Sequence, residues 1–328
     1  MILVKPSVEM IQEADPFKKI ELVGRTCYKS EDLITEDSAY KFVSGLVKRS
    51  HFAMLEHARV TFEVRGIMSI PYQILNMPAV GYSRKEVKDG DLVNSVHYVT
   101  LSASHILKYE YTESDPVSGT DLFLRMCYIC FLTKYTKART ESDQLPGECK
   151  YMFDENRSIK IRIIEDLKSD IVDYDESDND IHNSYTFKFV CDRGVSHELV
   201  RHRCAVAQES TRYCNYSKAK FGGQVTFVEP ANFDSWDDDA QSEFKGVMEQ
   251  AEATYLRALE CHNLQPQQAR AFLPNALKTE VILTMPVWQW KHFFNLRSIG
   301  TTGAPHPDMK VVADIALEMF QKVEGTDK

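Results

Sequence analysis

The chain has 328 residues, of which 43% are hydrophobic and 27% charged. This composition is ordinary for a folded globular protein of one large or two modest domains. No segment approaches the roughly 18 consecutive apolar residues of a membrane-spanning helix, and the N-terminus has no signal-peptide core. We therefore expect a cytoplasmic protein without membrane contact. The net charge of −9 argues against a general nucleic-acid binder, because a phosphate backbone requires a broad basic surface.

The cysteines indicate no particular site, whereas the distribution of charged residues points to one segment. Eight cysteines are scattered along the chain, and a protein of this size builds a core without disulfides, so we expect reduced thiols. Residues 165–180 hold eight carboxylates against one lysine, whereas 193–220 hold six basic residues against two glutamates. The basic stretch is the first candidate for local anion binding.

The first 65 residues predict the order strand, helix, helix, strand. The apolar run 2–4 predicts a strand stopped by Pro6, and Asp37 is placed to cap a helix that ends at His51. Alternation of apolar and polar residues over 60–64 predicts a strand with one buried face.

Residues 66–183 sustain no such alternation, and only a helix near 121–135 is predicted there. Regular patterns resume after this block. The predicted elements are a strand over 185–191 and helices over 195–203, 237–262, 267–271 and 308–323. Val247 belongs to the apolar stripe of the second helix, and Pro274 interrupts the segment after the third. We expect a discontinuous domain, 1–65 and 184–328, with an insertion of unknown role at 66–183.

The densest polar constellation is an R-H-R triplet at 201–203, followed after six residues by S-T-R-Y at 210–213. If the triplet is helical, its two arginines point about 200° apart and address different ligands. Arginine forks match phosphate and carboxylate oxygens, so the pattern suits two separate anions. On spacing alone, a solvated basic face paired with Glu198 or Glu209 explains it equally well.

Other patterns carry less information. Cys127 and Cys130 form a single C-x-x-C, which two cysteines buried one helical turn apart explain as well as a redox or zinc site does. The spacing of His51 and His57 matches no common zinc pattern, so no metal site is expected. G-x-G-x-x-G and G-x-x-x-x-G-K-[ST] are absent, which argues against Rossmann and P-loop nucleotide binding. The aromatic residues over 288–294 suit a planar heterocycle, although an aromatic core explains the phenylalanines better.

The segment 191–216 resembles the signature of the flavin-dependent thymidylate synthases, the ThyX family, in which an R-H-R triplet precedes S-x-R-Y. Three further segments agree with that family. Residues 51–64 resemble its G-H-x-x-x-x-E-H strand entry, 268–280 its A-R-x-x-L-P segment, and 290–297 with 304–307 its C-terminal nucleotide-binding region. The gap after the triplet holds six residues where the family pattern has seven. The block 66–183 corresponds to a long insertion.

The resemblance implies an α+β fold, with an antiparallel or mixed β-sheet core packed with helices. It implies an obligate homo-oligomer, a homotetramer whose active sites lie at subunit interfaces. The implied reaction is reductive methylation of dUMP to dTMP, with methylenetetrahydrofolate as carbon donor, FAD as hydride carrier and NADPH as reductant. One competing hypothesis is a catalytically impaired nucleotide- or flavin-binding regulatory protein. Another, an RNA-interaction module over 193–220, is disfavoured by the net charge.

The resemblance also implies site residues. Arg297 would be catalytic, because an arginine at the pyrimidine edge stabilises the anionic ring. Ser210 is the second catalytic candidate, for which we favour ligand positioning, since the motif assigns no adjacent base. The implied dUMP site comprises Glu198, Arg201, Gln208, Ser210, Arg212, Arg270 and Arg297. The implied FAD site comprises His57, Arg201, His202, Arg203, Gln208 and His292. No cysteine is needed as a nucleophile.

Overall fold

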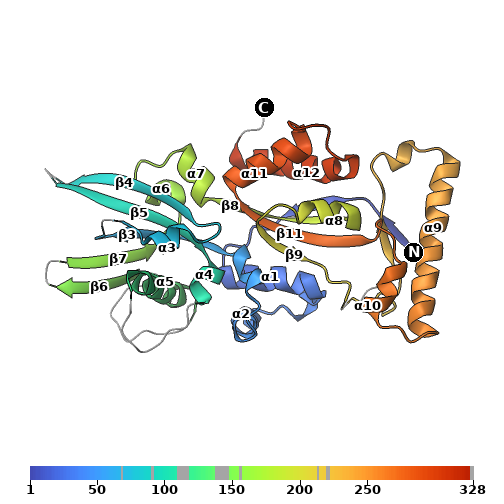
Figure 1. Ribbon diagram of the computed structural model, residues 1–328, viewed down its shortest axis with the longest axis horizontal. Helices are drawn as coiled ribbons and strands as arrows, with labels where there is room; N and C mark the ends of the chain where they lie inside the picture. The colour runs from blue at the N-terminus through green and yellow to red at the C-terminus, as the bar shows by residue number, and fades with distance from the viewer. Residues whose placement is uncertain are drawn as a thin grey trace.

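The computed structural model describes residues 1–67, 69–89, 92–108, 118–136, 148–154, 157–212, 214–218 and 222–325. Figure 1 shows them as an elongated molecule. A four-stranded sheet with helices on both sides forms the middle, a five-stranded sheet extends to one end, and α9 (Asp238–Glu260) stands across the other end. Tyr213 and Lys220 of the basic stretch lie outside the described residues.

The four-stranded sheet is antiparallel throughout. Its order is β2 (Ser7–Met10), β8 (Ser184–Asp192), β11 (Lys278–Pro286) and β9 (Ala205–Gln208). The helices on one side are α8 (Arg193–Leu199), α11 (Val287–Phe294) and α12 (Pro307–Glu324), and those on the other are α1 (Pro16–Tyr28) and α2 (Ser38–Lys48). Because both faces are covered, both rows of side chains on β11 are buried.

Strand β11 illustrates this double burial. Leu283 belongs to the cluster formed with the aromatic residues of α11, while Ile282 packs with Val23 and Cys27 of α1. A strand buried on both faces has a continuous apolar run in place of alternation. The sequence patterns therefore missed β11: they predicted a helix over 267–271 and an interruption at Pro274, with no strand after it.

The five-stranded sheet is built around a strand of the N-terminal segment. Its order is β4 (Gly81–Asp89), β5 (Leu92–Ser102), β3 (Arg59–Arg65), β7 (Arg157–Ile163) and β6 (Glu148–Asp154), all antiparallel. Phe62 of β3 lies opposite Val99 on one side and Ile163 on the other. The block 66–183 thus supplies four strands that complete a sheet around β3, where the sequence predicted only a helix. Every residue from Val96 to Leu101 is 0% exposed, which removes the alternation expected of a strand.

The predicted helix of this block is confirmed as α5 (Gly119–Tyr135). Cys127 and Cys130 of α5 are both fully buried, and the Cys130 thiol lies 3.4 Å from the carbonyl oxygen of Ile161. The single C-x-x-C is therefore a packing feature of this helix.

The acidic stretch forms α6 (Leu167–Asp170) and α7 (Glu176–His182), on the other face of the five-stranded sheet. Its carboxylates have cationic partners. Asp178 lies 2.6 Å from Lys85 Nζ, Asp170 lies 3.3 Å from Arg162, and Asp180 lies 2.7 Å from Lys291 Nζ of α11. The stretch therefore links the five-stranded sheet to the middle of the molecule.

The remaining elements are short. They are β1 (Ile2–Val4) parallel to β10 (Thr226–Val228), α3 (Tyr72–Leu75), α4 (Ala103–Leu107), α10 (Pro266–Ala269), the 3₁₀ turns η1 (Glu31–Leu33), η2 (Phe52–His57), η4 (Phe233–Ser235) and η5 (Arg270–Phe272), and the π-helical turn η6 (Asn295–Ile299). None of the described helices is both long enough and apolar enough to cross a membrane.

Four expectations need correction. The strand predicted over 60–64 was expected to bury one face, but Thr61 and Glu63 are 6% and 4% exposed, so both faces of β3 are buried. The helix predicted over 195–203 ends at Leu199, so Arg201 and Arg203 lie in the turn beyond it, and the helical argument for their divergence is wrong. The helix predicted to end at His51 ends at Lys48. Val247 is 59% exposed, so its predicted place in the core is wrong. The α+β class itself is confirmed, with antiparallel sheets packed by helices.

Candidate functional site

The predicted site residues lie around α8 and β9. The side chain of Asp192 caps α8 by accepting a hydrogen bond from the amide of Val195 at 2.9 Å. The R-H-R triplet follows the helix in a turn, and β9 then joins the edge of the central sheet, where Gln208 lies opposite Val281 of β11. The short helix and the edge strand therefore place the basic stretch along one border of the sheet.

Arg297 lies in the π-helical turn η6, directly after α11. π-helical turns are rare and recur at functional sites. Arg297 Nη1 donates to Glu198 Oε2 at 2.7 Å, and its Nε donates to His202 Nε2 at 3.2 Å. The structure thus brings together three predicted residues that are about a hundred positions apart in the sequence.

His202 is neutral at pH 7. Burial and the nearby charge of Arg297 lower the pKa of His202 to about 4, and its ring stands edge-on to Phe293 at 4.9 Å. Because its Nε2 accepts the hydrogen bond from Arg297, its proton is on Nδ1. A neutral imidazole orients the guanidinium without adding a second positive charge.

Glu198 has a further partner that the sequence patterns did not single out. His306 Nδ1 lies 3.0 Å from Glu198 Oε1, and His306 Nε2 lies 3.4 Å from Asp308 Oδ2. His306 belongs to segment 304–307, which the family resemblance had pointed to only as a segment. We refer to Glu198, His202, Arg297 and His306 as the Arg297 cluster.

A second group of predicted residues shares a cavity of about 580 Å³ between α1, η2, the end of β9 and η5. We call it the arginine cavity. Its polar lining includes the predicted residues Gln208, Ser210, Arg212 and Arg270, together with Arg193, Thr211, Ser50, His51 and the carboxylate Glu209. Arg193 was missed because a single arginine at the start of a helix carries no signal in one sequence. Three arginines from separate segments therefore face one cavity.

Hydrogen bonds fix the polar wall of the arginine cavity. Gln208 Nε2 donates to Ser196 Oγ of α8 at 2.9 Å, and Arg270 Nη1 donates to Thr211 Oγ1 at 3.0 Å. The amide of Ser210 donates to the carbonyl of Cys27 at 3.0 Å. Within the described part of the chain, the Ser210 hydroxyl has no hydrogen bond to a histidine or carboxylate, so nothing there activates it as a nucleophile.

Cys27 is the cysteine that lines the arginine cavity. Burial raises the pKa of the Cys27 thiol to about 11. The thiol is therefore protonated at pH 7, and the thiolate that nucleophilic attack needs is scarce.

A buried ion network lies behind Glu209, next to the arginine cavity. Lys278 Nζ lies 3.1 Å from Glu209 and 2.5 Å from Glu280, and Tyr216 donates to Glu209 at 3.1 Å. Lys29 also contacts Glu280. Although burial alone would raise it, the charges of Lys278 and Lys29 bring the pKa of Glu280 down to about 2. Glu209, Tyr216, Lys278 and Glu280 lie within the segments 191–216 and 268–280, but the network was not predicted, because the contacts between these segments form only in the folded chain.

The six residues predicted to contact FAD differ in exposure, and His202 and Gln208 are half-buried. Arg201, Arg203 and His292 are exposed, and Trp288 of the same surface helix is 52% exposed. His57 is fully enclosed, with its Nδ1 2.8 Å from Thr284 Oγ1. Burial lowers the pKa of His57 to about 3. An enclosed, neutral His57 has no surface to offer a ligand in this conformation.

Helix α8 connects the two functional groups. Arg193 at its start lines the arginine cavity, and Glu198 near its end belongs to the Arg297 cluster. At 1.5 Å per residue the two positions are about 7.5 Å apart along the helix axis. One chain therefore presents two neighbouring groups of cationic side chains.

The similarity to known proteins covers the segments that carry these two groups of residues. The family described as thymidylate synthase complementing protein matches residues 9–76 and 124–324, most of the chain. The flavin-dependent thymidylate synthase of Pyrococcus furiosus is 35% identical over 118 residues, 35% of this chain and 47% of that protein. Those of Geobacter sulfurreducens and Thermococcus kodakarensis are 36% identical over 146 residues and 34% identical over 149 residues.

These last two alignments cover 44% and 45% of this chain, and 58% and 57% of the relatives. The chain thus spans about half the length of the curated relatives it matches. The family match includes every residue of the Arg297 cluster and of the arginine cavity. The chain belongs to the thymidylate synthase complementing protein family, the family of the flavin-dependent thymidylate synthases.

Proposed function

We propose that this chain is a flavin-dependent thymidylate synthase of the cytoplasm, which methylates dUMP reductively to dTMP. Methylenetetrahydrofolate is the carbon donor, FAD the cofactor and NADPH the reductant. The observation that carries this proposal is the arginine cavity, in which four residues implied by the family motifs meet in about 580 Å³. That volume lies in the range of small-molecule sites.

The arginine cavity is the proposed dUMP site. Arg193, Arg212 and Arg270 supply guanidinium forks that match a monophosphate. Gln208 is held by Ser196, so its amide is oriented before substrate arrives. Ser210 acts as a positioning residue, through its place in the wall of the cavity. Arg201 and Glu198 complete the proposed contacts from the turn and from α8.

Arg297 is the proposed catalytic residue. Methylation at a pyrimidine carbon requires electron density in the ring, and a guanidinium at the ring edge stabilises the negative charge that develops there. Glu198 and neutral His202 hold that guanidinium in one orientation through hydrogen bonds of 2.7 and 3.2 Å. Because the arrangement exists before substrate binds, little reorganisation is required in the transition state.

The exposed residues Arg201, Arg203 and His292, beside Trp288, form the proposed FAD surface together with His202 and Gln208. Exposed guanidiniums next to an exposed indole fit a cofactor with a charged pyrophosphate and a planar ring. When bound, FAD supplies the hydride. We leave His57 out of this surface because it is enclosed beneath the central sheet.

We further propose a homotetramer whose active sites combine residues of different subunits. The Arg297 cluster and the arginine cavity lie at opposite ends of α8, so Arg297 of one subunit, together with the Glu198 that holds it, would serve the cavity of another. The catalytic domain would be formed by 1–65 and 184–328, and 66–183 would be an inserted lobe around β3.

The primary test is dTMP formation from dUMP by the purified protein with FAD, NADPH and methylenetetrahydrofolate under exclusion of oxygen. We expect turnover that needs all three, and a flavin absorption band that bleaches with NADPH and changes shape with dUMP. A protein that holds flavin and dUMP without forming dTMP would contradict the enzyme and favour the regulatory alternative.

Subunit sharing is tested by mixing two inactive variants, Arg297→Ala and Arg212→Ala, under conditions that exchange subunits. If each site takes one residue from each of two chains, random mixing restores about a quarter of the activity. No recovery in assemblies shown to be mixed would place both residues of a site on one chain.

A further inference from the structure

A cavity separate from the arginine cavity lies between the acidic stretch and the helices after the central sheet. Its volume is about 530 Å³, within the range of small-molecule sites. One wall is formed by α6 and α7, and the other by α11, η6 and α12. Figure 1 shows α7 beside α11, where the five-stranded sheet meets the middle of the molecule. We call this space the α12 cavity.

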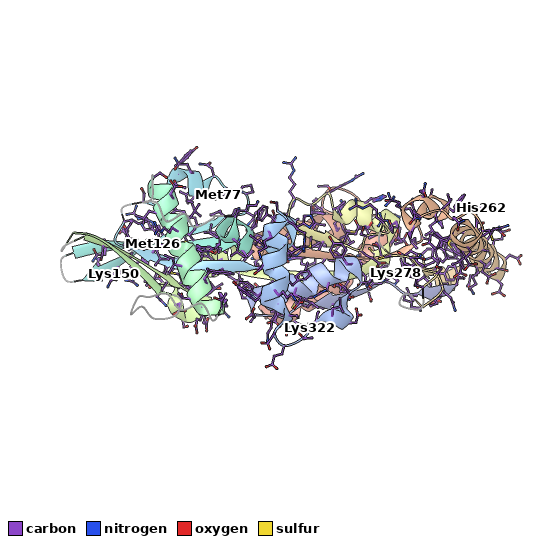
Figure 2. The ribbon with its side chains drawn as sticks, turned by 90° about the horizontal axis from the view of Figure 1, so that it is seen from below. Met77, Met126, Lys150, His262, Lys278 and Lys322 are labelled. Carbon is purple, nitrogen blue, oxygen red and sulfur yellow. The ribbon has the colours of Figure 1, made fainter. Side chains whose placement is uncertain are left out.

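The α12 cavity adjoins the turn that carries Arg297. Asn295 and Ile299, two positions before and after Arg297 in η6, line the cavity, whereas Arg297 itself does not. Figure 2 shows Lys322 of α12 near the middle of the molecule, and Lys278 of the ion network nearer the end formed by α9. The α12 cavity shares no lining residue with the arginine cavity, so it is a separate site.

Glu324, the last residue of α12, brings a negative charge to this cavity. The Tyr185 hydroxyl donates to its Oε1 at 2.5 Å, and the Asn179 amide donates to its Oε2 at 2.7 Å. Both donors are neutral. Among the described residues, no lysine, arginine or histidine pairs with Glu324. A half-buried carboxylate with only neutral partners attracts a cation.

The two lysines that line the cavity do not balance this charge. Lys291 Nζ lies 3.0 Å from Glu176 and 2.7 Å from Asp180, so its own charge is already compensated. Lys168 is exposed, and it is the one lysine against the eight carboxylates of 165–180. The lining therefore has an excess of negative charge.

Two further observations indicate a negative potential inside the α12 cavity. Burial raises the pKa of the Tyr174 hydroxyl in its wall, and the charges of Glu324 and of three carboxylates of the acidic stretch raise it further. Two helices also end there, α12 at Glu324 and η6 at Ile299. The carbonyl groups at the carboxyl end of a helix carry partial negative charge and accept hydrogen bonds. The cavity therefore offers acceptors to a positively charged donor.

The rest of the lining is aromatic and aliphatic. Phe294, Leu317 and Phe320 line the cavity, and the ring of Tyr185 stands edge-on to Phe320 with centroids 5.6 Å apart. Aromatic rings attract organic cations, and apolar walls favour an alkyl chain. The part of the chain that the structure describes holds no group of three or more side chains that could ligate a metal ion. The lining thus suits an organic cation better than a metal.

We propose that the α12 cavity binds a small aliphatic primary amine. Its ammonium group would contact Glu324 and donate its remaining hydrogens to the carbonyl groups at the end of α12, since an ammonium has three donors and no acceptor. Its alkyl chain would lie against Leu317 and Phe320. The proposal does not rest on the proposed enzymatic function, because the residues of the cavity belong to neither the arginine cavity nor the Arg297 cluster.

The probe is n-pentylamine, titrated into the protein at pH 7 in a calorimeter. Neutral n-pentanol and anionic pentanoate have the same chain length and serve as comparisons. We expect saturable binding of the amine, about tenfold weaker binding of pentanol, and none of pentanoate.

Glu324→Gln should weaken amine binding about tenfold, as expected for the loss of a charge-assisted contact, and leave pentanol binding unchanged. Glu318→Gln removes an exposed carboxylate from the same helix and is the matched control, which should bind the amine as wild type does. Equal binding of amine and pentanol, or amine binding that Glu324→Gln leaves unchanged, would overturn the proposal.

A second pair of variants tests the place of binding. Val323, which is 47% exposed, lines the cavity next to Glu324. Val323→Lys supplies a cation at this point and should abolish amine binding, whereas Val323→Leu should retain it. If Val323→Lys still binds the amine, the site lies elsewhere.

The same ammonium chemistry is offered by a lysine side chain of a second copy of this chain. Light scattering separates the two sources. A free amine as ligand leaves the mass of the assembly unchanged at saturation. A mass that falls as n-pentylamine is added would assign the cavity to the lysine of a second copy and overturn the proposal.

Discussion

The two antiparallel sheets both bury polar side chains, but the surroundings of these side chains differ. In the five-stranded sheet, one group of buried polar side chains forms a chain of contacts: the Thr61 and Thr100 hydroxyls are 2.7 Å apart, and Thr100 lies 2.7 Å from Nδ1 of His182. His182 Nε2 then lies 2.9 Å from the hydroxyl of Ser83. In the four-stranded sheet, buried Glu209 and Glu280 adjoin a cavity lined by three arginines. Buried polarity alone therefore does not identify a site; cationic side chains gathered around a cavity do.

Of the substitutions considered for the two sheets and their sites, replacement of Arg297 should have the largest effect, a loss of turnover, because it removes a group proposed to act in the transition state. We expect Arg297→Ala to lower kcat by about 10²- to 10³-fold, with a smaller change in flavin content. Steady-state kinetics and the flavin absorbance of the purified variant measure the two quantities. Arg257→Ala, at an exposed position of α9, is the control. Equal loss of turnover and flavin in an intact oligomer would refute the assignment.

A substitution in the ion network behind the arginine cavity should lower the free energy of unfolding more than other substitutions in the central sheet. Glu280→Gln leaves Lys278 with Glu209 at 3.1 Å, and Lys29 with Glu31 at 3.8 Å and Glu209 at 4.0 Å, as the nearest remaining carboxylates. We expect the free energy of unfolding to fall by about 3 kcal/mol at pH 7, which corresponds to the lowered pKa of Glu280. Urea unfolding measures it. Glu318→Gln, which breaks an exposed pair with Lys322, should change it by less than about 0.5 kcal/mol.

The effect of Glu280→Gln on the free energy of unfolding should also depend on pH. Because the pKa of Glu280 is about 2 in the folded chain and about 4.3 in an unfolded one, its contribution is present above pH 4.3 and lost as pH falls toward 2. The difference between wild type and Glu280→Gln should therefore shrink with acidification in this window. A constant difference would show that the carboxylate is not held in its charged form.

In the five-stranded sheet the corresponding test is His182→Gln. Burial lowers the pKa of His182 to about 4, so the unfolded chain takes up this proton first as pH falls below about 6.5. Between pH 7 and pH 5 the wild type should lose about 2 kcal/mol more unfolding free energy than the variant does. Other histidines titrate in both proteins and cancel. Identical losses would mean that the pKa of His182 is not lowered in the folded sheet.

The comparison of the two sheets also explains which features the sequence could predict. Strand β3 was found because apolar and polar residues alternate along it, although both of its faces are buried. Strands β5 and β11 are buried on both faces as well, and they were missed because their sequences do not alternate in this way. Residues of the arginine cavity were found where they belong to motifs, as Arg212 and Arg270 do. Arg193 and His306 were missed because their roles arise from contacts made only in the folded chain.

Arg193 offers a test of the arginine cavity that does not rely on any motif. If its guanidinium holds the substrate phosphate, Arg193→Gln should raise KM for dUMP about tenfold, which corresponds to about 1.4 kcal/mol. The weak turnover of deoxyuridine, which lacks the phosphate, should stay unchanged. Steady-state kinetics with dUMP and with deoxyuridine distinguish phosphate binding by Arg193 from a structural role. Equal losses would give Arg193 a structural role, which its backbone hydrogen bond to Asn275 already suggests as the alternative.

Arg203 should give the smallest effect, because its side chain is exposed and its carbonyl is already held by Gln289 at 2.9 Å. Arg203→Ala removes one fork of the proposed FAD surface, so we expect FAD affinity to fall about fivefold, as for a solvated charge-assisted contact. Arg203→Lys keeps the charge but lacks the fork, and should recover only part of the affinity. Fluorescence quenching of FAD measures all three proteins. Unchanged affinity in Arg203→Ala would move the flavin pyrophosphate away from the triplet and toward the arginine cavity, and would reverse the assignment of the two anions.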